Sequence, residues 1–429
     1  MRILFASMPA DGHFNPLSGV AEYLGQRGHE VCWYAGPRYA AKVASLGMTC
    51  YPYRLATEVT GENLHEMFPE RAKLKGPKRL SFDLEQFFVA NVDNHYRDIA
   101  EIRATYPFDV FFCDGAVYAE KLVAERLGVP VFAVALSTVI PDVHGPPPFF
   151  GLRPARTIVG KTVHRVVRAM LTSTMKQGVR TYNEILASEG IAPIPDDGFP
   201  HAPMLCARRV FLNGSPGLEF PHYQPPANAE FVGALLPARS ALGPPVPLPP
   251  AVMDPAATVV AVSQGTVDNA DPTKLIVPAL EALENGPYVV VVTTGGTQTA
   301  ELRRRFAAPN VLIEDFINYE DLFRHVDVFV TNGGYGSVLA AMCHGVPVVG
   351  AGTREGKNDI NARIAYNQLG IALRTERPKA SKIAAAVRRV LDDPQIIANV
   401  ARLRGELHSY DPMAIIEAAL HAEPLTARP

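Results

Sequence analysis

The sequence predicts an α/β protein built from two similar domains, each a doubly wound parallel sheet of the Rossmann type. An internal repeat is the main observation behind this prediction. Residues 108–115 (FDVFFCDG) resemble residues 326–333 (VDVFVTNG), and Gly-Val-Pro-Val follows at 128–131 and again at 345–348. Each copy has the pattern of a strand, a turn, a helix, a break and a second strand. That pattern is a βαβ unit, which requires a right-handed crossover between parallel strands.

A proline-rich stretch divides the chain. Seven prolines fall within residues 237–255, a density that we expect no helix or central strand to tolerate. We therefore predict a first domain at 1–236, a linker at 237–255 and a second domain at 256–405. The remaining residues, 406–429, are expected to form a C-terminal segment that packs back on the first domain. The total length of 429 residues suits two or three domains with full cores.

The first domain is predicted to open with a strand, a loop and a helix. Residues 2–6 are apolar and strand-like, and residues 7–14 are expected to form the loop that follows. Asn15 is then predicted as the N-cap and Pro16 as the first residue of a helix that runs to Gly28.

The most informative stretch is the glycine-rich turn at 331–337 (TNGGYGS), which lies between an apolar strand-like run at 326–330 and a helix-like run at 338–342. Such a turn leaves backbone N–H groups free at a helix start, which suits a phosphate or diphosphate. From the glycines alone, a close-packed turn without a ligand is an equal alternative. Ligands of doubly wound sheets bind beyond the carboxyl ends of the strands. Asp114 and this turn occupy that place in their respective halves.

Composition and charge argue against several classes of protein. The net charge of −2 and the pI near 6.6 argue against a binder of nucleic acid or of an acidic membrane. The five cysteines lie far apart, without a CxxC pair, which argues against a disulfide framework or a zinc site. The apolar run at 3–6 is too short for a signal peptide, and no run approaches the roughly 18 residues of a membrane span. These observations predict a cytoplasmic protein without stable membrane insertion.

Two segments, 54–95 and 141–225, do not follow strict βα alternation and are rich in aromatic residues. Core packing is expected to explain most of these residues, and a pocket for a bulky apolar substrate is the alternative. The residues concerned are Phe68, Phe82, Phe87, Phe88, Phe149, Phe150, Phe199 and Phe211.

Motifs of other α/β enzymes are missing or incomplete. The first βα loop, 10–13, has one glycine where a dinucleotide site needs GxGxxG. Residues 160–162 (GKT) resemble the end of a phosphate-binding loop, but Ala155 stands where its first glycine should be. Neither Asp-x-Asp nor Gly-x-Ser-x-Gly occurs. Two Rossmann domains without metal or dinucleotide motifs occur chiefly in nucleotide-sugar enzymes.

On these residues the chain resembles, over nearly its full length, the two-domain (GT-B) glycosyltransferases of the macrolide and UDP-glucuronosyl/UDP-glucosyl type (family 1). The resemblance implies two Rossmann-like domains facing across a cleft. It also implies inverting transfer of a sugar from a UDP- or dTDP-sugar to a hydroxyl of an apolar acceptor such as a polyketide, macrolide, terpenoid or phenol. No cofactor or metal is expected, and the protein is expected to be a monomer or a homodimer. The motifs that carry the resemblance are residues 12–17 (GHFNPL), Asp114, 263–266, 314–317 (EDFI), 331–337 and 345–347.

The resemblance also implies roles for single residues. His13 would be the general base, because an imidazole with a pKa near 6.5 is mostly neutral at pH 7. Asp114 would orient this imidazole and stabilise the imidazolium. Phe316 would stack on the nucleobase, and the backbone of Ile317 would read the base edge. The diphosphate would be held by Gly333, Gly334, Gly336 and Ser337 on one side and by Gly265 and Thr266 on the other.

Two departures from the family pattern bear on the donor. The family usually has a histidine at the position of Asn332, and an Asp/Glu-Gln pair where Lys357 and Asn358 align. Glu355 or Asp359 could replace the missing acceptor of the sugar hydroxyls. We therefore expect a relaxed preference for fully hydroxylated hexoses, with deoxysugar donors used at least as well as UDP-glucose.

Two other functions stay open on the sequence alone. One is a sugar-nucleotide epimerase of the same fold, which would need acidic groups to handle an elimination. The other is a catalytically silent sugar-nucleotide-binding partner protein. The pair of His13 and Asp114 favours transfer over both.

Overall fold

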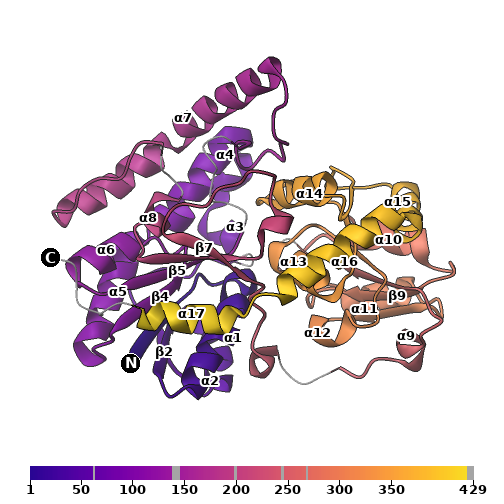
Figure 1. The fold of residues 1–429 in the computed structure, drawn as a ribbon, viewed down its shortest axis with the longest axis horizontal. Coiled ribbons are helices and arrows are strands. Elements are labelled where there is room, and N and C mark those ends of the chain that lie inside the picture. Colours follow the sequence, from indigo (N-terminus) through magenta and orange to yellow (C-terminus); the bar gives the residue numbers. More distant parts are fainter. Residues whose placement is uncertain (61–62, 138–144, 198–200, 243–245, 267–268, 423–429) are drawn as a thin grey trace.

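Two parallel sheets, one in each half of the chain, organise the molecule (Figure 1). The computed structural model describes residues 1–60, 63–137, 145–197, 201–242, 246–266 and 269–422. The first sheet has the strand order β3-β2-β1-β4-β5-β6-β7, and the second has β10-β9-β8-β11-β12-β13. Every pair of neighbouring strands is parallel. Both orders begin in the Rossmann pattern 3-2-1-4-5-6, so the prediction of two doubly wound domains is confirmed.

The first half contains strands β1 to β7 and helices α1 to α8. The strands are β1 Arg2–Ala6, β2 Glu30–Ala35, β3 Thr49–Pro52, β4 Val110–Asp114, β5 Val131–Ala135, β6 Arg209–Asn213 and β7 Ala229–Gly233. The helices are α1 Asp11–Gln26, α2 Ala40–Ser45, α3 Leu64–Met67, α4 Gly76–Asp83, α5 Val92–Thr105, α6 Glu120–Arg126, α7 Ile158–Ser188 and α8 Ala202–Leu205.

The second half contains strands β8 to β13 and helices α9 to α17. The strands are β8 Val259–Ser263, β9 Val289–Thr293, β10 Val311–Glu314, β11 Val328–Thr331, β12 Val348–Gly350 and β13 Gly370–Ala372. The helices are α9 Pro250–Met253, α10 Ile276–Leu283, α11 Thr299–Arg305, α12 Tyr319–Leu322, α13 Tyr335–His344, α14 Lys357–Tyr366, α15 Ala380–Asp392, α16 Pro394–His408 and α17 Pro412–His421.

Both faces of the first sheet are buried, because helices cover each face of a doubly wound sheet. Side chains alternate between the faces along a strand. Along β1, Ile3 and Phe5 lie in one apolar cluster, and Leu4 and Ala6 lie in another. The sheet therefore presents only its strand ends and their loops to a ligand.

The internal repeat corresponds to a repeated contact. Asp109 precedes β4, and its carboxylate accepts a hydrogen bond of 2.8 Å from the N–H of Arg2, the first residue of β1. Asp327 precedes β11, and its carboxylate accepts a hydrogen bond of 2.8 Å from the N–H of Val259, the first residue of β8. Equivalent aspartates thus fix the start of the central strand in each sheet.

The predicted start of the first helix is wrong. Helix α1 begins at Asp11, so Pro16 lies inside it and Asn15 is not its N-cap. The carbonyl of Ala10 accepts the N–H groups of His13 and Phe14 at 2.9 and 3.0 Å, which closes the first turn ahead of the proline. Proline removes only one backbone donor, and the preceding turn is already hydrogen-bonded. His13 therefore lies in the first turn of a helix and not in a loop.

The described part of the proline-rich stretch contains two short helical segments, a 3₁₀ turn at Arg239–Leu242 and helix α9, contrary to the expectation that it would contain no helix. Helix α9 starts at Pro250, a position that needs no N–H partner, and its Val252 belongs to the core of the second half. At the other end of the stretch, Ala238 and Ala241 belong to the core of the first half. The stretch is thus anchored to both cores within its described residues.

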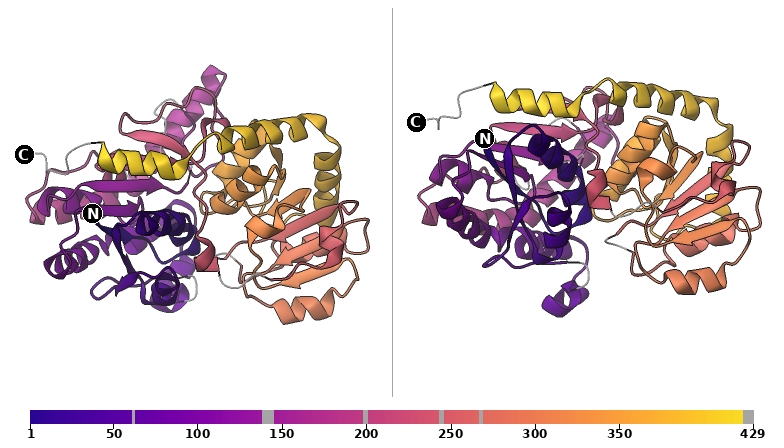
Figure 2. Two further views of the ribbon diagram at one scale, coloured as in Figure 1. Left: turned by 60° about the horizontal axis from the view of Figure 1, so that its bottom comes forward. Right: turned by 90° about the horizontal axis from the view of Figure 1, so that it is seen from below.

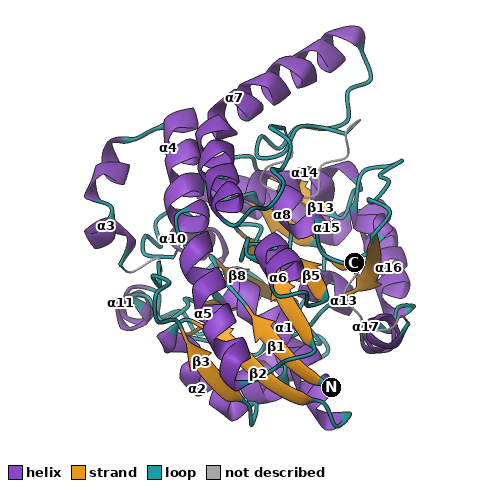
Figure 3. Cartoon of the chain, turned by 90° about the vertical axis from the view of Figure 1, so that its left-hand side faces the viewer, coloured by secondary structure: helices purple, strands orange, loops and turns teal. Residues whose placement is uncertain are grey.

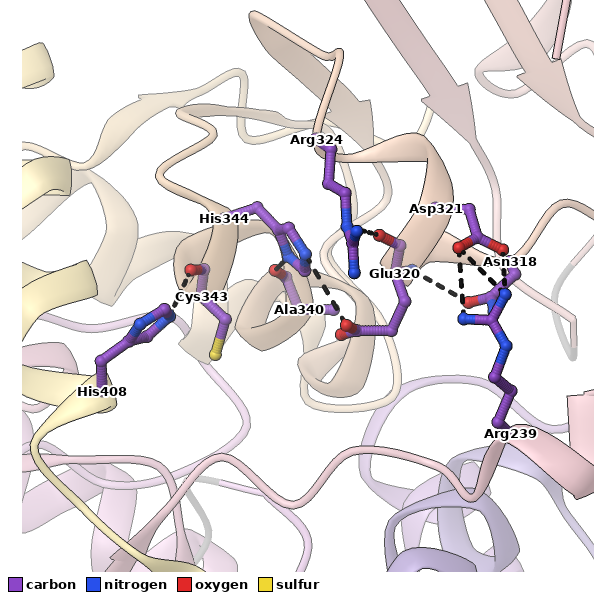
Figure 4. A network of polar contacts seen from close by, with 9 residues as sticks. All are labelled: Arg239, Asn318, Glu320, Asp321, Arg324, Ala340, Cys343, His344 and His408. Atoms are coloured by element: carbon purple, nitrogen blue, oxygen red, sulfur yellow. Dashed lines mark hydrogen bonds and ion pairs between the residues drawn. The ribbon is translucent and has the colours of Figure 1, made fainter.

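The C-terminal helices cross from one half to the other (Figure 2). Helix α16 packs against α13 of the second half, and His408 Nε2 lies 2.8 Å from the carbonyl oxygen of Cys343 (Figure 4). Helix α17 lies on the first half, where Ile416 and Leu420 are buried in its core. Glu417 accepts hydrogen bonds of 2.8 Å from Tyr23 and Arg27.

Polar contacts join the halves near the ends of β6 and α13. Arg363 and Glu219 form a buried ion pair at 2.6 Å, and the Tyr335 hydroxyl donates to the carbonyl of Asn213. Arg239, in the proline-rich stretch, forms an exposed ion pair with Asp321 of α12 at 3.1 Å (Figure 4). Losing one partner of a buried pair costs about 3 to 5 kcal/mol, whereas an exposed pair contributes about 1 kcal/mol or less. Arg363 and Glu219 are therefore the more important contact.

Most of the aromatic residues noted in the sequence are half-buried and pack against other side chains. Phe211 is fully buried in β6, and Phe68, Phe82 and Phe87 form a mutual ring cluster. Phe150 is 40% exposed. Phe88 and Phe149 pack against the cluster around α7, and Phe199 lies outside the described residues. None of the helices in the described ranges has the length and hydropathy that crossing a bilayer requires.

Candidate active site

His13 and Asp114 meet where the strand order of the first sheet reverses. Strands β1 and β4 are neighbours, and the register pairs Ala6 with Cys113. Asp114 therefore stands one residue beyond this pair, and the loop after β1 leads directly to His13. This position between β1 and β4 is the topological switch point, where ligands of such sheets bind.

The Asp114 carboxylate is fully buried and fixed by backbone groups. Its two oxygens accept the N–H groups of Met8 and Ala116 at 2.6 and 2.7 Å. Two amide donors stabilise the charged form of a carboxylate in a place where water is excluded. Asp114 is thereby a fixed negative charge next to His13.

His13 is positioned by that charge. Its Nδ1 lies 3.2 Å from Asp114 Oδ1, and its side chain is 32% exposed. Nδ1 itself is buried, without an in-line hydrogen-bond partner among the described residues, so the exposed part of the ring includes the edge away from Asp114. Burial lowers the pKa of His13, but the negative charge of Asp114 beside Nδ1 outweighs this effect, and the pKa lies above its usual value.

Two aromatic side chains hold the loop between β1 and α1. The Tyr53 hydroxyl donates to the carbonyl of Ser7 at 2.7 Å, and Trp33 Nε1 donates to the Ser7 hydroxyl at 3.1 Å. Both rings are buried. The next residue, Met8, supplies one of the amides that bind Asp114. Neither aromatic was predicted as a site residue, because the contact joins strands far apart in the sequence.

The second sheet has an equivalent position between β8 and β11, which are also neighbours. Asn332 follows β11, and its Nδ2 donates to the carbonyl of Gln264, which follows β8. A side chain on Gly265 would contact this amide, and Gly265 has a φ of +80°. The predicted Gly265 and Asn332 therefore lie together. Thr266, also predicted, is exposed beside them.

The glycine-rich turn has the shape of an anion site. Gly333 has a φ of +95°, and a Cβ there would lie 2.7 Å from Asn361 Oδ1, so no other residue fits. Gly334 is the N-cap of α13 and makes no side-chain cap hydrogen bond. A Cβ on Gly336 would meet nothing within 4 Å, and the Ser337 hydroxyl donates to the Gly334 carbonyl at 2.9 Å. The N–H groups of Gly333 and Gly334 bond the side chains of Thr331 and Asn332, each at 3.3 Å, so the N–H groups of the first turn of α13 are the ones that can meet a ligand.

Phe316 follows β10, the edge strand of the second sheet, whereas the glycine-rich turn follows β11. It is 57% exposed, and its ring lies over Gly296, where a Cβ would be 3.6 Å away. Ile317 is buried in the core and fixes the backbone on which Phe316 stands. An exposed aromatic ring on a rigid base suits stacking with a nucleobase.

Some of the residues expected near the donor sugar pair with each other, and others bond the first half of the chain. Lys357 pairs with Glu355 at 2.7 Å, and Glu355 keeps half of its side chain exposed. Asn358 donates to the carbonyl of Phe149, and Asp359 accepts the N–H groups of Phe149 and Gly151. These contacts tie α14 to a segment of the first half. Glu355 is therefore the more exposed of the two acidic groups, but one of its oxygens is already paired with Lys357.

Asn361 is a site residue that the sequence did not predict. It is 2% exposed, and its Nδ2 donates to the carbonyls of Asn332 and Gly352 at 3.3 and 2.9 Å. Its hydrogen bond to the Asn332 carbonyl fixes the backbone of the glycine turn. Its position within the α14 sequence gave no indication of this contact, because the partners lie in two other loops.

The two halves bring these groups to one region, since α1 of the first half contacts α13 of the second. Two Rossmann sheets that meet in this way, with a histidine–aspartate pair on one and a glycine-rich helix start on the other, have the architecture of the GT-B class of glycosyltransferases.

Comparisons with known proteins specify the family. The profile of the erythromycin biosynthesis protein CIII-like C-terminal domain matches residues 280–420. The 4′-demethylrebeccamycin synthase of Lentzea aerocolonigenes is 33% identical over 423 residues, which cover 97% of this chain and 97% of that protein. The chain belongs to the nucleotide-sugar-dependent glycosyltransferases of the antibiotic and natural-product type.

Solved structures agree in fold. The calicheamicin glycosyltransferase CalG4 aligns with a TM-score of 0.74 and 20% identity over 99% of each chain. The glycosyltransferase VinC, solved in complex with dTDP, aligns with a TM-score of 0.67 and 18% identity over 98% of each chain. The GT-B fold predicted from the sequence is confirmed.

Proposed function

We propose that this glycosyltransferase inverts the anomeric carbon of a UDP- or dTDP-sugar and joins the sugar to a hydroxyl of an apolar small molecule. The observation that carries the proposal is the contact between His13 and Asp114 at the first switch point. A buried carboxylate behind a partly exposed imidazole is the arrangement that general-base catalysis needs.

In the proposed reaction, Nε2 of His13 takes the proton of the acceptor hydroxyl while the acceptor oxygen attacks C1 of the sugar. The bond between C1 and the diphosphate oxygen breaks on the opposite face, so the configuration inverts. The diphosphate leaves with the electron pair of that bond. The N–H groups at the start of α13 then meet its charge.

Asp114 acts through His13. Its charge stabilises the imidazolium that forms, which is the physical meaning of the raised pKa of His13. The raised pKa also means that His13 is protonated in a larger fraction of the free enzyme near neutral pH. The active form is therefore expected to increase as the pH rises through the pKa of His13.

The donor is proposed to bind without a metal. Gly333, Gly334, Gly336 and Ser337 supply backbone and hydroxyl groups for the diphosphate, and Phe316 supplies the stacking face. The dTDP bound to VinC supports a dTDP-sugar as one donor. Because Lys357 is engaged with Glu355, we propose relaxed demand for a full set of sugar hydroxyls.

The acceptor is proposed to be a polyketide, macrolide, terpenoid or phenol. The name of the synthase from Lentzea aerocolonigenes, an antibiotic-type relative, supports a natural-product acceptor. A reducing cytoplasm is the proposed location, supported by five free cysteines. The proposed oligomeric state is a monomer or a homodimer.

Mass spectrometry can test the proposal by following release of nucleotide and formation of glycosylated product with panels of UDP- and dTDP-sugars and hydroxylated aglycones. We expect product with the wild type and a loss of about 10² or more in turnover for His13→Ala. His325→Ala is the matched control and should retain activity. Wild-type turnover by His13→Ala, or a product with retained anomeric configuration, would contradict the proposed mechanism.

A further inference from the structure

The amino-terminal half of α7 carries an exposed apolar stripe. Four side chains recur at intervals of three to four residues and so share one face of the helix: Val159, Val163, Val166 and Met170, with exposed fractions of 74%, 46%, 63% and 38%. Ile158, at the first position, is 83% exposed. These five are nearly half of the eleven large hydrophobic residues that are exposed in the described chain.

This part of α7 projects away from the body of the protein. Two views a quarter turn apart show its amino-terminal end extending beyond the other elements (Figures 1 and 3). All buried residues of the helix lie at Leu171 or later. The stripe can therefore approach an extended surface without a clash with the rest of the chain.

The charge around the stripe has one sign. Residues 145–175 contain five Lys and Arg residues and no Asp or Glu. The chain as a whole carries −2, so the remainder carries −7 (−2 − 5). The whole-chain charge argued against an acidic membrane, but it conceals this local excess. The basic residues are Arg153, Arg156, Lys161, Arg165 and Arg168.

We propose that the amino-terminal half of α7 attaches this protein reversibly to the surface of an anionic phospholipid bilayer. Its apolar stripe would lie at the boundary of the acyl chains, and its basic side chains would lie among the headgroups. Long Lys and Arg side chains can reach the headgroups along an apolar surface. The attachment does not depend on the proposed reaction, because none of these residues belongs to the active site.

Other occupants of this face fit less well. Two copies of α7 would place like charges together without an acidic partner, which opposes a homodimer through this face. A nucleic acid would satisfy the cations but leave the apolar stripe exposed to water. An acidic protein groove would satisfy both features, and the experiment below separates it from a bilayer.

Flotation of the full chain with vesicles tests the proposal. One set consists of phosphatidylcholine, and the other contains about a third phosphatidylglycerol, each at about 0.1 M and about 0.5 M salt. We expect the bound fraction to be at least about 10-fold higher on anionic vesicles at low salt. The variants Val159→Asp/Val166→Asp and Lys161→Glu/Arg165→Glu should each lower binding about 10-fold or more.

Matched controls separate these effects from a general change in charge or apolar surface. Ile397→Asp, on α16, removes a half-exposed apolar residue, and Lys382→Glu/Arg388→Glu, on α15, reverses two exposed cations. Both should bind vesicles as the wild type does. Equal binding to both vesicle types, or equal loss in the controls, would overturn the proposal. Retention on polyglutamate beads together with indifference to vesicles would identify an acidic protein surface instead.

Discussion

Replacement of Asp114 by Asn should shift the pH dependence of catalysis as well as its rate. At 3.2 Å between Nδ1 and Oδ1, Coulomb's law gives about 1 kcal/mol in water and about 5 kcal/mol at an effective dielectric constant of 20. His13 is partly exposed, so the effect lies between these limits. When the charge is removed, the pKa of His13 should therefore fall.

The direction of the shift follows from the raised pKa of His13 in the wild type. Without the carboxylate, the neutral imidazole persists to lower pH, so the acidic limb of the kcat/KM profile moves to lower pH. The plateau should nevertheless fall by about 10² or more, because the amide neither stabilises the imidazolium nor enforces its tautomer.

The assay is kcat/KM for one donor and one acceptor, measured from acidic to basic pH for the wild type and Asp114→Asn. Asp109→Asn is a matched control, since Asp109 fixes the start of β1 away from His13. Its profile should superimpose on that of the wild type after scaling. An acidic limb at the same pH in Asp114→Asn and wild type would refute the assignment of His13 as the titrating base held by Asp114.

Four further predictions concern the donor site and stability. Activity should survive EDTA, because the start of α13 neutralises the diphosphate; loss that Mg²⁺ restores would contradict this. Phe316→Ala should raise the donor KM about 10-fold with little change in kcat, since base stacking is worth about 1 to 3 kcal/mol. Glu219→Ala should lower the free energy of unfolding by about 3 to 5 kcal/mol, measured by urea denaturation, because the buried guanidinium of Arg363 loses the carboxylate that balances its charge; a loss below about 1 kcal/mol would show that water or another group compensates. Burial lowers the pKa of His95 to about 4, below the value of about 6.5 in the unfolded chain. The free energy of unfolding should therefore be independent of His95 above about pH 6.5 and should fall by about 1.4 kcal/mol per pH unit as the pH decreases from there toward 4. His95→Gln should remove this slope in urea denaturation measured across that pH range.

The sequence by itself determined the two-domain fold and the general location of the site. The repeated pattern around Asp109 and Asp327 implied two parallel sheets, because a strand, helix and strand with a short break can form only that unit. The carboxyl ends of the strands then placed Asp114 and Asn332 at ligand-binding edges. These inferences rest on chain-local patterns, which is why they could be drawn from residues alone.

The tertiary structure decided the details that depend on contacts between distant residues. Asp359 and Asn358, expected near the sugar, bind backbone groups at Phe149 and Gly151, which lie more than 200 positions away in the chain. The start of α1 was also predicted wrongly, because Asn15 and Pro16 are typical of a helix start. In the structure the backbone N–H groups of His13 and Phe14 bond the Ala10 carbonyl, so the helix begins one turn earlier than predicted.

The apolar stripe of α7 shows the same limit. Its spacing is that of any amphipathic helix, and such a stripe usually faces a core. Only the fold places the first part of the helix beyond the core, while Leu171 and later residues pack against it. Periodicity identifies which side chains share a face, whereas the neighbours that cover that face are set by segments brought together in folding. The sequence therefore defines the faces of its elements, and the tertiary structure decides which of them remain open.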